Sequence, residues 1–193
     1  GADYLTLDEA VSAGLLEISE VSDGGSVPQL RLANKSERTV FLMAGEHLAG
    51  GKQNRVLNAS LLAAAGVSLP IPVTCVERGR WAHRSAHFEG SSTSSHSTLR
   101  KMMHEQATAG YRSTSRPTSD QGEVWREVDR KLGETSSSSD TMYLHKAYED
   151  TLAVMAPTVE RLAAPEGASG AAFAYGGKIV GFDLFGRPAT LAA

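Results

Sequence analysis

The stretch from Gly45 to Trp81 carries the strongest fold signals in this 193-residue chain. It begins with the polar run GEHLAGGKQNR (45–55) and ends with the polar run CVERGRW (75–81). The sequence around these runs is rich in Val, Ile and Leu, which favours β-strands, whereas the glycines of the first run predict a bend at 45–51. We expect strands at residues 39–43, 53–64 and 69–77. Polar side chains this dense beside core strands are uncommon, so we interpret the two runs as two sides of one site.

The sequence before Gly45 predicts a short helix and two further strands. Thr6 and Glu9 have the spacing of a capping box, in which each side chain satisfies a backbone N–H group at a helix start. Alternating apolar residues then predict strands at 15–22 and 27–33. Short strands separated by turns at this spacing indicate an N-terminal antiparallel β-sheet, folded as a sandwich or a partial barrel.

The remaining sequence predicts a loop, a helical section and a terminal hairpin. Serine and threonine dominate residues 89–98, so we expect a mobile loop over about 82–98. Helices are expected within 99–163, and Pro157 should kink the last of them or split it in two. Gly176-Gly177 predicts a β-hairpin within 170–185 that rejoins the sheet. The residues of the last helix expected to point inward are Leu144, Tyr148, Leu152, Met155, Val159 and Leu162.

These elements define an α+β fold class, expected as a single domain over residues 1–193 with its β-rich part at 1–81. The chain is 41% hydrophobic and 21% charged, as in ordinary globular proteins. Its net charge of -3 argues against general nucleic-acid binding. One cysteine excludes a disulfide within the chain, and no apolar run is long enough to span a membrane. We expect a cytoplasmic protein; its oligomeric state is left open.

A cluster of basic, amide and aromatic residues forms the candidate ligand-binding set. Arginine matches phosphate and carboxylate groups with two parallel hydrogen bonds, and neighbouring glycines let the backbone approach an anion closely. A charged side chain facing the core side of a strand must be paired. The cluster is therefore either an anion or nucleotide pocket, or a buried polar network that holds two strands together. Its members are Lys52, Gln53, Asn54, Arg55, Arg78, Arg80 and Trp81.

Three residues are candidates for a catalytic role. Glu46 and Glu77 are the available partners for the arginines and could act as orienting carboxylates or as a general base. Cys75 is a possible nucleophile, but strand alternation places it among core residues, where a thiol usually packs as a small hydrophobe.

Histidines provide a separate metal-binding hypothesis. His83 and His87 are four residues apart, and His47 could be a third ligand if the fold brings it near. The alternative is that they are surface histidines, because no carboxylate completes a zincin motif. No Walker loop, dinucleotide fingerprint or nucleophile elbow is present, so no cofactor is indicated.

The polar runs also carry a family resemblance. GE at 45–46, KQNR at 52–55, the segment from Ile71 to Trp81 and QGEVW at 121–125 resemble the uncharacterised ARG and rhodanese-phosphatase-superfamily-associated protein domain family. The closing segment 170–185 is similar as well. The family name refers to ADP-ribosylglycohydrolases, so the resemblance implies a neighbourhood of ADP-ribose, NAD or phosphate chemistry.

Three functions follow in order of preference. The first is a soluble domain that binds a small anionic nucleotide-like ligand. Processing of that ligand is a further possibility under this hypothesis. The second is a non-enzymatic interaction or scaffold domain in which the polar cluster is a structural network. The third is a metal-dependent hydrolase.

Overall fold

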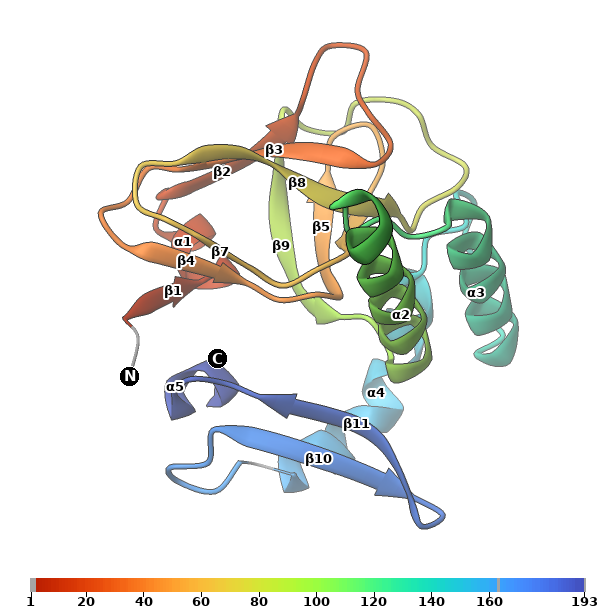
Figure 1. Cartoon of the computed structure of the whole chain (residues 1–193). Helices are drawn as coiled ribbons and strands as arrows, with labels where there is room; N and C mark the ends of the chain where they lie inside the picture. Colours follow the sequence, from red (N-terminus) through yellow and green to blue (C-terminus); the bar gives the residue numbers. More distant parts are fainter. Residues whose placement is uncertain (1–2, 163, 193) are drawn as a thin grey trace.

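The computed structural model describes residues 3–162 and 164–192. Its central feature is a closed barrel of six strands (Figure 1). Every neighbouring pair in the barrel is antiparallel. Closure occurs where the first strand pairs with the last, Ile18 opposite Phe88. In barrel order the strands are β2 (Leu16–Glu20), β3 (Gln29–Asn34), β8 (Ser68–Cys75), β6 (Arg55–Leu57), β5 (Glu46–Gly50) and β9 (His87–Ser94).

A small second sheet extends one side of the barrel. It has the order β1 (Tyr4–Thr6), β4 (Thr39–Leu42) and β7 (Leu61–Ala63). Helix α1 (Leu7–Ser12) follows β1, and the predicted capping box is present, with Thr6 Oγ1 accepting from the Glu9 N–H and Glu9 accepting from the Thr6 N–H. One apolar core joins this sheet, α1 and the barrel interior. It includes Leu7, Ile18, Leu30, Leu48, Ile71 and Phe88, all nearly or completely buried.

Three helices form a second apolar core against the outer side of β6 and β8 (Figure 1). They are α2 (Ser97–Thr114), α3 (Gln121–Glu134) and α4 (His145–Arg161). Val56 and Val76 contribute from the barrel side, and the helices add Leu99, Met103, Val124, Val128, Leu132 and Ala147, with Leu144 just before α4. Strand alternation explains the two cores, because Val56 points outward while its neighbours Arg55 and Leu57 point inward.

The chain ends in the predicted hairpin, β10 (Gly170–Tyr175) and β11 (Lys178–Leu184), followed by α5 (Pro188–Ala192). Gly176 and Gly177 both have positive φ, as a tight hairpin turn requires. Contrary to expectation, the hairpin does not rejoin the barrel, and within the described residues β10 and β11 pair only with each other. A closed barrel has no free edge to accept another strand.

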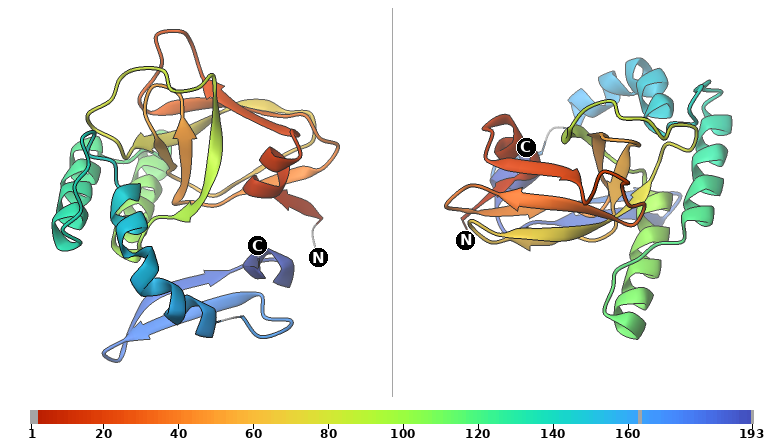
Figure 2. Two further views of the ribbon diagram at one scale, coloured as in Figure 1. Left: turned by 180° about the vertical axis from the view of Figure 1, so that it is seen from behind. Right: turned by 90° about the horizontal axis from the view of Figure 1, so that it is seen from above.

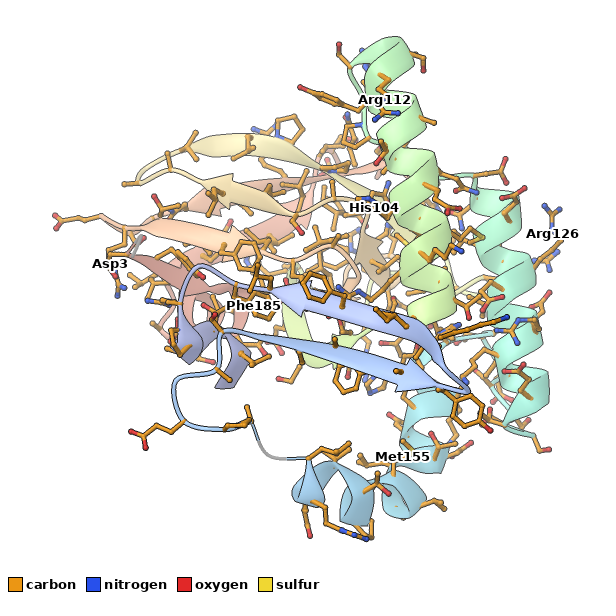
Figure 3. The ribbon with its side chains drawn as sticks, turned by 60° about the horizontal axis from the view of Figure 1, so that its bottom comes forward. Asp3, His104, Arg112, Arg126, Met155 and Phe185 are labelled. Carbon is orange, nitrogen blue, oxygen red and sulfur yellow. The ribbon has the colours of Figure 1, made fainter. Side chains whose placement is uncertain are left out.

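Several side-chain contacts hold the hairpin and α5 against the rest of the molecule. Arg100 of α2 pairs with Asp183, with 2.8 Å between Nη1 and Oδ2. Tyr4 and Thr190 share a hydrogen bond of 2.7 Å. The ring of Phe185, which directly follows β11, lies edge-on to Phe41 of β4. Figure 3 labels Phe185.

The α+β class, the antiparallel barrel-like sheet and the helical middle section are confirmed, but three local predictions are wrong. The expected bend at 45–51 contains β5, and the expected long strand at 53–64 is divided between β6 and β7. The expected loop at 82–98 contains β9, a full barrel strand. The hydrogen bonds between paired strands use backbone groups. A Ser-rich segment can therefore form a strand if the strands on both sides have free backbone N–H and C=O groups.

Two further points concern the helices. Pro157 lies inside α4, which continues through it as one helix. The C-terminal half of α4 is also more exposed than expected, since Leu152, Met155 and Val159 are at least half accessible. Over the part of the chain that the structure describes, no helix is both long and apolar enough to cross a bilayer.

Candidate functional site

The candidate site lies at one end of the barrel, where the β2–β3 loop, the turn 51–54 and the loop 78–86 meet. We call its inner residues the mouth cluster: Glu20, Gln53, Arg55, Cys75 and Trp81. A Cβ atom on Gly25 would lie within 3.4 Å of Lys52, Glu20 and Trp81 side-chain atoms, which shows how closely the three loops converge. An open pocket of about 530 Å³ lies beside them, lined by Ser19, Glu20, Ser22, Asp23, His83, Arg84, Ser85 and Ala86.

Arg55 is the central residue of the mouth cluster. Its position on β6 points the side chain into the barrel, and it is completely buried. Nη1 donates to the backbone oxygen of Gln53 at 3.2 Å and to Gln53 Oε1 at 3.1 Å. Nε and Nη2 are buried and have no hydrogen-bond partner among the described residues. The guanidinium carbon lies 5.7 Å from the ring centre of Trp81, which is half exposed.

Glu20 is the functional candidate that the sequence analysis missed. Its Oε1 accepts from the Lys52 N–H at 3.1 Å, while Oε2 is buried and unpaired within the described residues. The signal for it was available, because Leu16, Ile18 and Glu20 alternate along one strand and share the inward face. Among the described residues, the hydrogen-bonding capacity of the Arg55 cation and of the Glu20 carboxylate at the mouth is therefore only partly used.

Cys75 packs beside this cluster. Its thiol lies 2.9 Å from Gln53 Oε1, and burial raises the pKa of Cys75 to about 11, against the opposing charge of Arg55. A thiol with such a pKa is almost entirely protonated near neutral pH, so its environment favours packing over nucleophilic attack.

Arg80, Glu77 and Asn54 form a separate network that braces the loops. Arg80 donates to Glu77 Oε2 from Nε at 2.9 Å and from Nη2 at 2.6 Å, and Nη1 reaches the backbone oxygens of Gly51 and Ala82 at 2.8 Å each. The Asn54 N–H donates to the same Glu77 oxygen at 3.0 Å. Burial alone would raise the pKa of Glu77, but these hydrogen bonds hold it below its ordinary value. These groups are already well paired with the protein.

Two of the predicted site residues lie away from the mouth. Arg78 points toward helix α3, with its guanidinium 5.3 Å from the Trp125 ring centre and 3.6 Å from Asp129. Glu46 lies at the start of β5, in a pocket of about 180 Å³ that also includes Asp8, Ser94 and Phe185. The structure thus brings together Lys52, Gln53, Arg55 and Trp81, places Asn54, Glu77 and Arg80 beside them, and separates Arg78 and Glu46.

The Glu46 carboxyl has an unusual environment. Burial is the main cause that raises the pKa of Glu46 from 4.5 to about 7, and the charge of Asp8 adds to it. Because the pKa in the folded state lies above the unfolded value, the protonated carboxyl favours folding below pH 4.5, and this contribution is lost as the pH rises through about 7.

Glu46→Gln should therefore change stability in a pH-dependent way. At pH 8 the variant should be more stable than the parent by up to about 3 kcal/mol, since it removes a buried charge, whereas at pH 4.5 the two should be equal. Urea unfolding at both pH values measures the difference. Glu89→Gln, at an exposed position of β9, controls for loss of one surface charge. Equal stabilities at pH 8 would contradict the prediction.

The three candidate metal-binding histidines occupy different surroundings. His47 is buried, with Nε2 2.8 Å from Ser95 Oγ, and burial, followed by the charges of His145 and His96, lowers the pKa of His47 to about 3. His83 and His87 are exposed, on the loop before β9 and at its first residue. Within residues 3–162 and 164–192, no group of three or more His, Cys, Asp or Glu side chains could hold a metal ion.

Comparison with known proteins gives one match. The model of the ARG and Rhodanese-Phosphatase-superfamily-associated Protein domain matches residues 1–193, the whole chain. Searches of curated proteins and of solved structures gave no match. The match agrees with the resemblance carried by the polar runs of residues 45–81.

Proposed function

The chain belongs to the ARG and Rhodanese-Phosphatase-superfamily-associated Protein domain family, and from this premise we propose that it binds a small anionic ligand at the mouth of its barrel. The ligand is nucleotide-like, of the ADP-ribose, NAD or phosphate-linked class that the family's name suggests. A cytoplasmic location and the absence of general nucleic-acid binding remain predictions.

The observation that carries this proposal is the state of the Arg55 guanidinium. A buried cation normally has an anion and a full set of hydrogen-bond acceptors, because leaving a charge unpaired in the interior costs several kcal/mol. Arg55 instead uses one of its three nitrogens and leaves Nε and Nη2 without partners in the described part of the chain. Nε and Nη2 lie side by side on the guanidinium and match the two oxygens of a phosphate or carboxylate group. Both atoms are buried, so a ligand reaches them only when the half-exposed Trp81 side chain moves aside.

Residues around Arg55 support recognition of more than an isolated anion. The Trp81 ring has Lys52 Nζ and the Arg55 guanidinium each 5.7 Å from its centre, and its half-exposed surface could stack on a planar ring. Glu20 Oε2 offers an unused acceptor for a ligand N–H or O–H group. An oxyanion at Arg55 with a hydroxyl or amide at Glu20 is a chemistry that nucleotide derivatives provide.

Arg55→Met tests this proposal, because methionine fills similar apolar volume without the charge. The parent protein should melt at a higher temperature in saturating ADP-ribose, NAD or inorganic phosphate, since a ligand that binds only the folded state stabilises it by mass action. The variant should lose that shift. Without ligand it should be at least as stable as the parent, because an unpaired buried charge has been removed. Thermal unfolding followed by circular dichroism measures both effects.

Arg31→Met, at an exposed position of β3, is the matched control and should keep the ligand-induced shift. The proposal is overturned if none of the three ligands raises the melting temperature of the parent, or if Arg55→Met responds as the parent does. A large loss of stability in Arg55→Met without ligand would instead identify Arg55 as a structural residue.

The interaction-domain hypothesis is favoured by one specific observation, the completeness of the network around Arg80. Its guanidinium already donates to a carboxylate and to three backbone oxygens, Gly50, Gly51 and Ala82. We assign a structural role to Arg80 and Glu77. The structural-network hypothesis therefore applies to these residues, and the ligand-binding hypothesis applies to Arg55 and its neighbours at the mouth.

A further inference from the structure

The C-terminal part of the chain exposes an apolar surface that is unlike the rest of the molecule. Of the fifteen large hydrophobic residues exposed among the described ones, eleven lie between 152 and 184, so exposed apolar side chains are concentrated in this part of the chain. We call the part of this area that lies on one side of each element the arm face. Its members are Leu152, Met155, Val159 and Leu162 on or directly after α4, and Ile179, Phe182 and Leu184 on one face of the hairpin.

The helical part of the arm face has the pattern of a buried helix side. Leu152, Met155, Val159 and Leu162 are spaced by three and four residues, which aligns them on one side of α4. Such a stripe normally packs against another element, yet each of these residues is between 50% and 64% exposed. Only the start of α4 reaches the core, through Ala147 and the preceding Leu144. Figure 3 shows Met155 on the part of α4 that lies away from the barrel.

The hairpin part is equally uncovered. Phe182 and Leu184 lie opposite Ala172 and Gly170, whose side chains are too small to cover them. They point away from the face of Asp183, which binds Arg100 of α2. A two-stranded hairpin is marginally stable alone in water and needs a further layer on its apolar face. Figures 1 and 2 place the hairpin and the outer half of α4 on the same side of the barrel.

We propose that a second copy of this chain covers the arm face, with the helix stripe of each copy lying on the hairpin of the other. A helix stripe and an apolar sheet face are complementary layers, and two copies related by a two-fold axis would cover both at once. Seven side chains at about 100 Å² each offer roughly 700 Å² per copy, close to the ~800 Å² per partner of a standard stable interface.

Charge also selects a second copy over a charged partner. Residues 152–162 and 170–184 contain four charged side chains, Glu160, Arg161, Lys178 and Asp183. Asp183 is already paired with Arg100, so its charge is not offered to a partner. A surface with so little charge is best matched by another apolar surface, and an identical copy supplies one without a separate gene product.

The test is the oligomeric state of the full chain, measured by light scattering after size-exclusion chromatography and by sedimentation. The parent should be a dimer at micromolar concentration. Phe182→Glu and Met155→Glu, one on each part of the arm face, should each weaken the dimer about 30-fold or more, because either places a charge in an apolar interface. Leu62→Glu, on β7 and 64% exposed like Phe182, is the matched control and should leave the dimer intact.

Far-ultraviolet circular dichroism should be the same for the parent and all three variants, since the replaced residues are exposed in a single copy. The proposal is overturned if the parent stays monomeric at every concentration from the micromolar range to about 100-fold above it. A dimer that persists in both Phe182→Glu and Met155→Glu also overturns it, because that dimer would use another surface. Neither outcome bears on ligand binding at Arg55, which lies at the barrel mouth.

Discussion

Arg80→Ala is expected to destabilise the protein by about 3–5 kcal/mol, because it leaves the buried Glu77 carboxylate without its cation. The Glu77 side chain is 5% exposed and the Arg80 side chain 15% exposed, so water cannot easily replace the lost partner. The same change removes donors from the backbone oxygens of Gly51 and Ala82, which Arg80 Nη1 reaches at 2.8 Å. The turn 51–54 and the loop after β8 would then lose their common anchor. Urea unfolding at pH 7 measures the loss.

Arg78→Ala is the control, since it removes the same side chain two residues away. Arg78 is more than half exposed and makes a 3.6 Å ion pair with Asp129 and a cation–π contact with Trp125. Exposed pairs of this kind contribute at most about 1 kcal/mol each. If Arg80→Ala cost no more than Arg78→Ala, the bracing role of the Arg80–Glu77 pair would be refuted.

Gly51→Ala should have a comparable effect, about 4 kcal/mol, for a steric reason. A Cβ atom at this position would lie 2.2 Å from Phe88 Cζ and 2.9 Å from Glu20 Oε1, and the residue has a φ of +50°. Phe88 is almost fully buried in the barrel core, so its ring has little room to move. Overpacking of a core costs about 1–3 kcal/mol, and a strained positive φ adds about 1 kcal/mol or more. Thermal unfolding of the variant measures the sum.

Gly66→Ala separates the two contributions. Gly66 also has a positive φ, +68°, but a Cβ atom there would meet nothing within 4 Å. This variant should lose only the backbone contribution, about 1 kcal/mol. Equal losses in Gly51→Ala and Gly66→Ala would show that Phe88 yields, and would contradict the close packing of the turn on the barrel core.

The turn at Gly50 and Gly51 also shows how much of the local structure could be predicted from the sequence. The glycines at 50 and 51 were expected to bring the backbone close to an anion, but the close approach is to Phe88 and to the backbone oxygen of His87. A close approach of the backbone, and with it the need for glycine, was therefore foreseeable from sequence. The identity of the neighbour was not, because β9 is far from this turn along the chain and has few apolar residues to mark it as a strand.

The same distinction applies to the candidate site. Alternation correctly put Arg55 and Cys75 on the inner face of their strands and left pocket and brace as alternatives. The three-dimensional arrangement places the carboxylates with different cations. Glu77 pairs with Arg80, and Glu20 lies with Arg55 at the mouth. Glu46 lies near Arg100 at the other end of β5. Charge pairing depends on distances across strands, and one sequence contains several carboxylates that could satisfy each arginine.

The sequence by itself determined the elements whose signals are local. The Thr6–Glu9 capping box, the Gly176-Gly177 turn, the helix at α3 and the alternation of the early strands all depend on residues within a few positions of one another. Tertiary structure alone decided that the sheet closes into a barrel through β2 and β9. It also decided that, within residues 3–162 and 164–192, two nitrogens of Arg55 have no hydrogen-bond partner and the apolar stripe of α4 stays uncovered. Those outcomes depend on long-range contacts, in which each group's partner is set by how the whole chain packs.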